Sequence, residues 1–172
     1  MDKQLEQALN TVEMTYGELV AIANDMLNPI FIPINNLVQS VQTTINAMSV
    51  DQIRDYILQL QLKAFEISDI KEKATLKAEL AEVLQKEHFA ISFQGADGTA
   101  TARDKLATIA TSQDTVAETL FNLIANLLKT KLDQLHRLVD ALKSILMSRM
   151  QEAKFLQTQT VGKPGERTYL AE

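Results

Sequence analysis

The chain has no cysteine and no tryptophan, and only 5% of its 172 residues are aromatic. Without cysteine it can form no disulfide, no thiolate metal site and no cysteine nucleophile, which is compatible with a reducing cytoplasm. No stretch approaches the roughly 18 uninterrupted apolar residues of a membrane-spanning helix. Residues 1–10 are polar and acidic, and lack the cationic start and apolar core of a secretory signal. We therefore expect a cytoplasmic protein with no membrane partner.

Catalytic and metal-binding motifs are missing as well. The two histidines, His88 and His136, lie far apart, and only Asp133 stands at a ligand-like spacing from His136. Helical bundles that bind two metal ions need such a spacing twice, with two further carboxylates. There is no P-loop, dinucleotide fingerprint or nucleophile elbow. The sequence predicts no catalytic residue, no metal site and no cofactor, and hence a protein that is not an enzyme.

The charge is unevenly distributed along the chain. Residues 1–101 carry a net charge of −7 and residues 102–172 a net charge of +2, which together give the formal −5. An acidic chain is a poor candidate for indiscriminate binding to nucleic acid. The basic C-terminal part leaves a narrower contact with nucleic acid or with an acidic partner open.

Apolar periodicity and turn residues predict one helical domain over residues 1–157. The expected helices are 3–27, 33–48, 50–87 and 115–157, with a short helix over 101–110 and a flexible tail over 158–172. Pro29 should end the first helix, because the residue before a proline resists the α conformation. Ser49 should cap the third through a capping box with Gln52. Residues 91–93 alternate as a short strand does.

Two of these helices carry apolar residues at alternating steps of four and three, the spacing that keeps one side of a helix against another. We call these residues the seam: Ile53, Ile57, Leu60 and Ile67 in the first helix, and Phe121, Leu128, Leu132, Leu135, Val139, Leu142 and Leu146 in the second. They predict an all-α fold, a long antiparallel, coiled-coil-like hairpin with two N-terminal helices in an elongated bundle. Helices of this length would extend beyond a compact globule, which favours a homo-oligomer.

Basic residues interrupt or flank this pattern. Arg149 occupies the next seam position after Leu146, and Lys131 also points close to the seam. Lys143 lies on a basic row with Lys129 and Lys154, which can equally be an ordinary solvated face. Arg103 and Lys105 lie near Phe89 and Phe93; basic and aromatic residues together can bind single-stranded nucleic acid, although two phenylalanines buried under a loop are the alternative.

Three segments carry a resemblance to a known family: residues 70–80, rich in Glu, Lys and Ala; residues 99–105; and the basic, Met-containing residues 141–154. In this order they resemble small helical proteins of phage replication and recombination modules, in particular recombination mediators of the UvsY type. The resemblance implies a ring-like oligomer that holds single-stranded DNA and loads a RecA-type recombinase. It also implies that Lys71, Lys73 and Lys77 face the DNA.

Two hypotheses follow. The first is a non-enzymatic phage-type recombination mediator that binds single-stranded DNA, with a recombinase or single-strand-binding protein as partner, in the host cytoplasm if phage-encoded. Its DNA-binding candidates are Lys71, Lys73, Lys77, Arg103, Lys105, Lys143 and Arg149. The second is a helical protein-binding module, such as a phage assembly factor or an anti-defence inhibitor. That module would bind a host or virion protein through its acidic N-terminal half.

Overall fold

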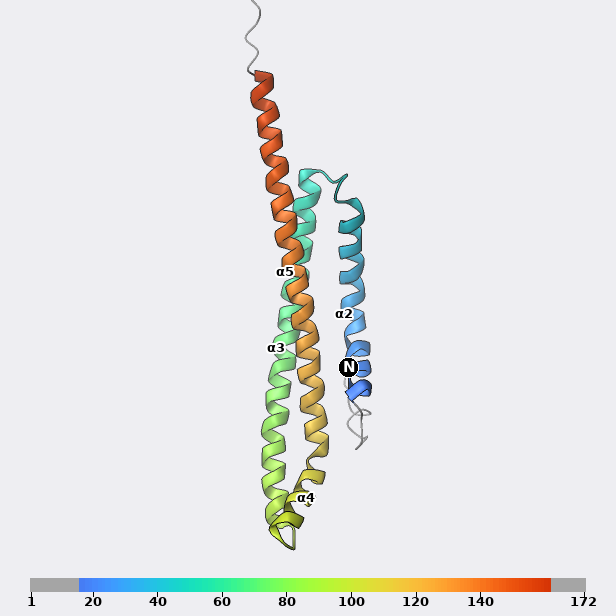
Figure 1. Cartoon of the computed structure of the whole chain (residues 1–172), viewed down its shortest axis with the longest axis vertical. Helices are drawn as coiled ribbons and strands as arrows, with labels where there is room; N and C mark the ends of the chain where they lie inside the picture. Colours follow the sequence, from blue (N-terminus) through green and yellow to red (C-terminus); the bar gives the residue numbers. More distant parts are fainter. Residues whose placement is uncertain (1–15, 162–172) are drawn as a thin grey trace, which may run out of the picture.

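The computed structural model describes the backbone of residues 16–161 and the side chains of residues 16–156. This part of the chain consists of four helices without a strand, α2 (Tyr16–Thr44), α3 (Val50–Gly95), α4 (Ala100–Ala110) and α5 (Ser112–Val161), which confirms the all-α prediction. Figure 1 shows α3 and α5 as a long antiparallel hairpin, with α4 at the turn and α2 alongside one half of it. No helix in this part is long and apolar enough to cross a membrane.

The start of α3 follows directly from its sequence. The Ser49 side chain accepts a hydrogen bond of 3.2 Å from the Gln52 backbone N–H, and the Ser49 backbone N–H donates one of 2.7 Å to the Gln52 side chain. The two bonds satisfy two backbone donors that a helix start otherwise leaves without a partner. The predicted capping box is confirmed.

The core of the hairpin is the seam. Its α3 members are all buried, and the α5 members are buried except Leu132 and Leu146, which are partly buried and pack against the same core. Burying one such side chain fully contributes roughly 1.5–3 kcal/mol relative to exposure. This row of contacts therefore supplies most of what holds the two long helices together.

Further along α3 the core is made of small side chains. The residues buried there are Ala74, Ala78 and Ala81, whereas Leu80 and Leu84 are exposed. Ala74, Ala78 and Ala81 continue the steps of four and three that define the seam, and Leu80 and Leu84 lie off these steps. The larger residues lie off the α5-facing side of the helix, and alanines that carry little hydrophobic signal take the buried positions.

The expected break between two N-terminal helices at Pro29 is also wrong, because α2 continues from Tyr16 to Thr44 with Pro29 and Pro33 inside it. The two prolines withhold hydrogen bonds from the carbonyls of Asp25 and Pro29, and all three of these residues are exposed. Water can therefore satisfy the two carbonyls, while the opposite side of the helix packs on α5 and α3. Residues 3–15 of the predicted first helix lie outside the described residues.

The turn of the hairpin is shorter than the sequence suggests. Residues 91–93, expected as a strand, belong to α3, which extends to Gly95 and ends where the Ala96 N–H donates to the Ser92 carbonyl at 3.1 Å. Gly98 has φ +114°, a conformation that suits glycine. Helix α5 begins at Ser112 rather than at 115.

The C-terminal end of α5 also differs from the prediction. The helix continues to Val161, so residues 158–161 of the predicted tail are helical. Residues 162–172 lie outside the described part of the chain.

Candidate interaction surfaces

The three lysines that the family resemblance assigns to DNA do not form one cluster. Lys73 donates to Asp69 one turn away at 2.6 Å, and the Lys77 ammonium lies 5.3 Å from the centre of the Phe121 ring. Lys71 is partly buried and lies two residues from Lys73, so it points to another side of the helix. Lys73 and Lys77 thus already have partners within the chain.

Arg149 closes the C-terminal end of α2. Its guanidinium donates to the carbonyls of Ile45 at 2.8 Å and Asn46 at 3.3 Å, and to the carbonyl of Met48. These carbonyls belong to the connection that follows Thr44, the last residue of α2, and a cation just beyond a helix C-terminus interacts favourably with the helix dipole. The basic residue in the seam therefore meets backbone oxygens of the same chain.

Two other basic residues of α5, Lys131 and Lys143, also contact residues of the same chain. Lys143 lies 3.5 Å from Asp140 on the same exposed side of the helix. Lys131 donates to Asn35 of α2, and its ammonium lies 5.6 Å from the centre of the Phe31 ring. Burial lowers the pKa of Lys131, because it disfavours the charged form. The contacts of Lys131 join α5 to α2, and the contact of Lys143 lies within α5. The two lysines therefore do not form one basic patch.

Near the turn of the hairpin, Arg103 of α4 lies over Phe93 of α3, with its guanidinium carbon 4.5 Å from the ring centre. The Phe93 ring stacks on Phe89, with centroids 6.1 Å apart and planes at 17°. Arg103 Nε is buried and has no hydrogen-bond partner among the described residues. Lys105 is exposed and, two residues from Arg103, points to another side of α4. Of the basic and aromatic residues that the sequence singled out here, the structure thus brings together Arg103, Phe93 and Phe89.

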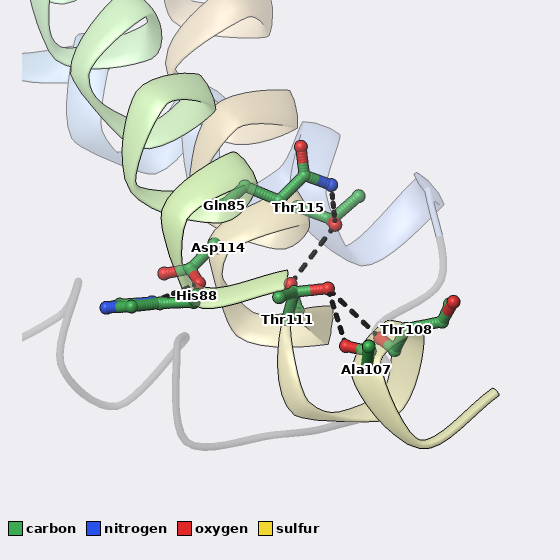
Figure 2. A network of polar contacts seen from close by, with 7 residues as sticks. All are labelled: Gln85, His88, Ala107, Thr108, Thr111, Asp114 and Thr115. Atoms are coloured by element: carbon green, nitrogen blue, oxygen red, sulfur yellow. Dashed lines mark hydrogen bonds and ion pairs between the residues drawn. The ribbon is translucent and has the colours of Figure 1, made fainter. Parts of the chain in front are cut away.

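A polar network joins the same end of α3 to the start of α5 (Figure 2). The Gln85 amide donates to the Thr115 hydroxyl at 2.7 Å, and His88 Nδ1 lies 2.7 Å from the Asp114 carboxylate. The Thr111 hydroxyl donates to the Ala107 carbonyl at 3.1 Å at the end of α4, and the Thr115 hydroxyl of α5 donates to the Thr111 carbonyl at 3.2 Å. The side chains pair with one another, and in the described part of the chain no group of three His, Asp or Glu residues could hold a metal ion.

The outer face of α3 exposes large apolar side chains. Six large apolar residues project from it, each between 56% and 75% exposed, and we call them the outer row: Leu58, Leu62, Phe65, Leu76, Leu80 and Val83. At 100° per residue they fall within about 60° of one another, opposite the side buried against α5. Isolated exposed apolar residues are ordinary, whereas apolar residues gathered along one side of a helix form a larger patch of the kind found at interaction sites.

Charged residues divide the outer row into two halves. Asp69, Glu72 and Lys73 lie on this side of α3 between Phe65 and Leu76, and all three are exposed. The row could have been found in the sequence, because its members follow the helical spacing as the seam does. The stronger seam on the same helix concealed it.

Two of the hollows in the described part of the chain lie against α3. One, of about 370 Å³, is lined mainly by apolar residues of α2, α3 and α5, with Lys73 and Lys77 at its edge. The other, of about 490 Å³, lies between α3 and α5 and includes His136 and Lys143. Neither brings together an acid, a base and a nucleophile at bonding distances.

No family model, curated protein or solved structure matches this chain. The fold and surfaces therefore define a class by themselves: an extended helical hairpin, buttressed by one further helix, with an apolar face left open along α3.

Proposed function

We propose that this protein is a non-enzymatic, cytoplasmic protein-binding module whose working surface is the outer face of α3. The partner of this face is an amphipathic helix, because a straight apolar row some 38 Å long, at 1.5 Å per residue, is matched by a second helix. The single observation that carries the proposal is the exposure of the outer row.

The energetics support a binding role for the outer row. Each of its residues retains more than half of its surface for burial, worth roughly 1 kcal/mol per side chain at the usual transfer values. Salt bridges within α3, such as Lys63–Glu66 at 2.8 Å, keep the neighbouring positions soluble without covering the row. The module therefore resembles one half of an interface.

The test is a tandem affinity purification of this protein carrying two tags. The chain that is retained with it is identified by its intact mass. In the face variant, Leu62→Gln and Leu80→Gln replace two residues of the outer row. In the control variant, Leu106→Gln and Ile109→Gln replace residues of α4 that are 52% and 65% exposed. We expect one stoichiometric chain, identified by its mass, to be retained by the wild type and the control and lost with the face variant. Equal retention by all three, or by none, contradicts the proposal.

A second candidate function is single-stranded DNA binding, as a recombination mediator that cooperates with a recombinase or single-strand-binding protein. The stacked group of Phe89, Phe93 and Arg103 supports it, because bases stack on such side chains. Against it, most of the other candidate lysines and arginines already have partners within the chain.

This second candidate predicts salt-sensitive binding of a labelled single-stranded oligonucleotide in fluorescence anisotropy. The logarithm of the affinity should fall with the logarithm of salt, with a slope of about −0.7 per phosphate contacted. The double variant Arg103→Gln, Lys105→Gln should lose binding, and the exposed Lys129→Gln on α5 should retain it. No binding at low salt rejects DNA binding and leaves the protein-binding proposal intact.

A further inference from the structure

The outer row of α3 consists of two equivalent halves. Leu58, Leu62 and Phe65 form the first, and Leu76, Leu80 and Val83 stand 18 residues further on with the same spacings of four and three. Eighteen residues are five complete helical turns, about 27 Å, so the two halves lie on the same side of the helix. Each half is at least 56% exposed throughout.

The sequence of this face is nearly unchanged in character when the helix is turned end for end about residue 71. Leu62 and Leu80 lie 9 residues to either side of this point, and Leu58 and Phe65, 13 and 6 residues before it, correspond to within one residue to Val83 and Leu76, 12 and 5 residues after it. Asp69 precedes it by 2 residues and Lys73 follows it by 2. The apolar residues of the outer row thus lie within one residue of an apolar counterpart, and Asp69 corresponds to Lys73.

Resting on the proposed protein-binding role of this face, we propose that its occupant is the same face of a second copy of this chain, with the two α3 helices antiparallel about a two-fold axis near residue 71. In this arrangement Leu62 of one copy lies level with Leu80 of the other. Asp69 of each copy lies level with Lys73 of the other, on both sides of the axis. Isologous two-fold contacts require this kind of self-complementary patch.

The charges select the antiparallel orientation. In a parallel pair each Asp69 would lie level with the other Asp69 and each Lys73 with the other Lys73, which is repulsive. In the antiparallel pair both become opposite-charge contacts, in addition to the 2.6 Å bond that joins Lys73 and Asp69 within each helix. Asp55 and Glu87 lie 16 residues to either side of residue 71. Asp55 of one copy would therefore lie level with Glu87 of the other and repel it, so the contact between the copies ends there.

The arrangement of the helices leaves room for this contact. In Figure 1 the middle of α3 lies at an edge of the molecule, and α2, which contacts both α5 and α3, borders the outer face at the hollow lined by Lys73 and Leu76. The buried side of α3 meets α5 through residues such as Leu60 and Ile67, which are 0% exposed. A second copy at the outer face would therefore leave the core of the hairpin unchanged.

Charge variants test the pairing by sedimentation equilibrium on the full chain. Asp69→Lys creates a copy with two lysines at the centre of the face, and Lys73→Asp creates a copy with two acids. Each variant alone should dimerise about tenfold more weakly than the wild type, and an equimolar mixture should recover mixed dimers. The control Asp133→Lys on α5 should behave as the wild type does. Folding is monitored by circular dichroism, since mixing cannot repair a variant that fails to fold.

Orientation is tested by pulsed electron–electron resonance, which is simple here because the chain has no cysteine. A nitroxide on Gln59→Cys, an exposed site beside the row, should give a distance between copies of about 36 Å in the antiparallel pair. A short distance at this site indicates a parallel pair and overturns the proposal. A monomeric wild type, or failure of the mixture to associate, overturns it as well. If the co-purification then still retains a different protein through the same face, the proposed function stands without this inference.

Discussion

The inner and outer faces of α3 carry the same kinds of side chain and have opposite surroundings. On the inner face, Ile53, Leu60 and Ile67 are completely buried against α5, and on the outer face Leu62 and Phe65 are exposed. Apolar spacing therefore identifies which residues need a partner. It does not identify whether that partner belongs to the same chain or to another chain. The inner face is satisfied within the chain, and the outer face has no cover among the described residues.

Truncating one inner-face residue should have the largest effect on folding. Leu60→Ala leaves a cavity in the hairpin core and should lower the free energy of unfolding by about 2–5 kcal/mol. The outer-face change Leu62→Ala, measured at a concentration where the chain is monomeric, should stay within about 0.5 kcal/mol. Urea unfolding followed by circular dichroism provides both values. Equal losses at the two sites would abolish the distinction between the faces.

Arg149 provides the next contrast, this time within α5. Arg149→Ala leaves the carbonyls of Ile45, Asn46 and Met48 in the α2–α3 connection without this donor and should cost about 1.5–3 kcal/mol, as expected for hydrogen bonds to a charged group. The exposed Arg137→Ala should change stability by less than about 0.5 kcal/mol. Thermal unfolding compares the two variants. A neutral Arg149→Ala would show that the α2 end does not depend on this contact.

The outer side of α2 allows a change in the stabilising direction. Pro29→Ala supplies the backbone donor that the Asp25 carbonyl lacks, and should raise the free energy of unfolding by about 1–2 kcal/mol. The higher helix propensity of alanine acts in the same sense. A raised midpoint of unfolding checks it, whereas a lowered one would show that the proline ring itself contributes to packing.

Lys131 should give the smallest effect, seen only in alkaline solution. Burial lowers its pKa from the ordinary value of 10.5. At pH values between the pKa of the folded state and this ordinary value, the unfolded state therefore binds more protons than the folded state. The Lys131 contribution to stability must therefore rise with pH in that window. The urea midpoint of the wild type, measured relative to that of Lys131→Met, should rise with pH in this window, because the variant lacks the titrating group. Parallel pH curves for the two proteins would contradict it.

Much of this architecture could be predicted from the sequence, because the seam and the Ser49 cap are local patterns with a direct physical meaning. The continuity of α2 could not, since a proline breaks a helix or not according to whether its freed carbonyls reach water. The role of Arg149 depends on a helix end about a hundred positions earlier in the chain. The outer row was present in the spacing of α3, where a stronger apolar row on the opposite side obscured it.

The most direct measurement of the central claim is the mass of the protein in solution by light scattering. At tens of micromolar the wild type should approach twice the 19.2 kDa mass of one chain. The variant with Leu62→Gln and Leu80→Gln should have the mass of one chain and an unchanged helical spectrum. A wild type that keeps the mass of a single chain at these concentrations would contradict pairing through the outer face of α3.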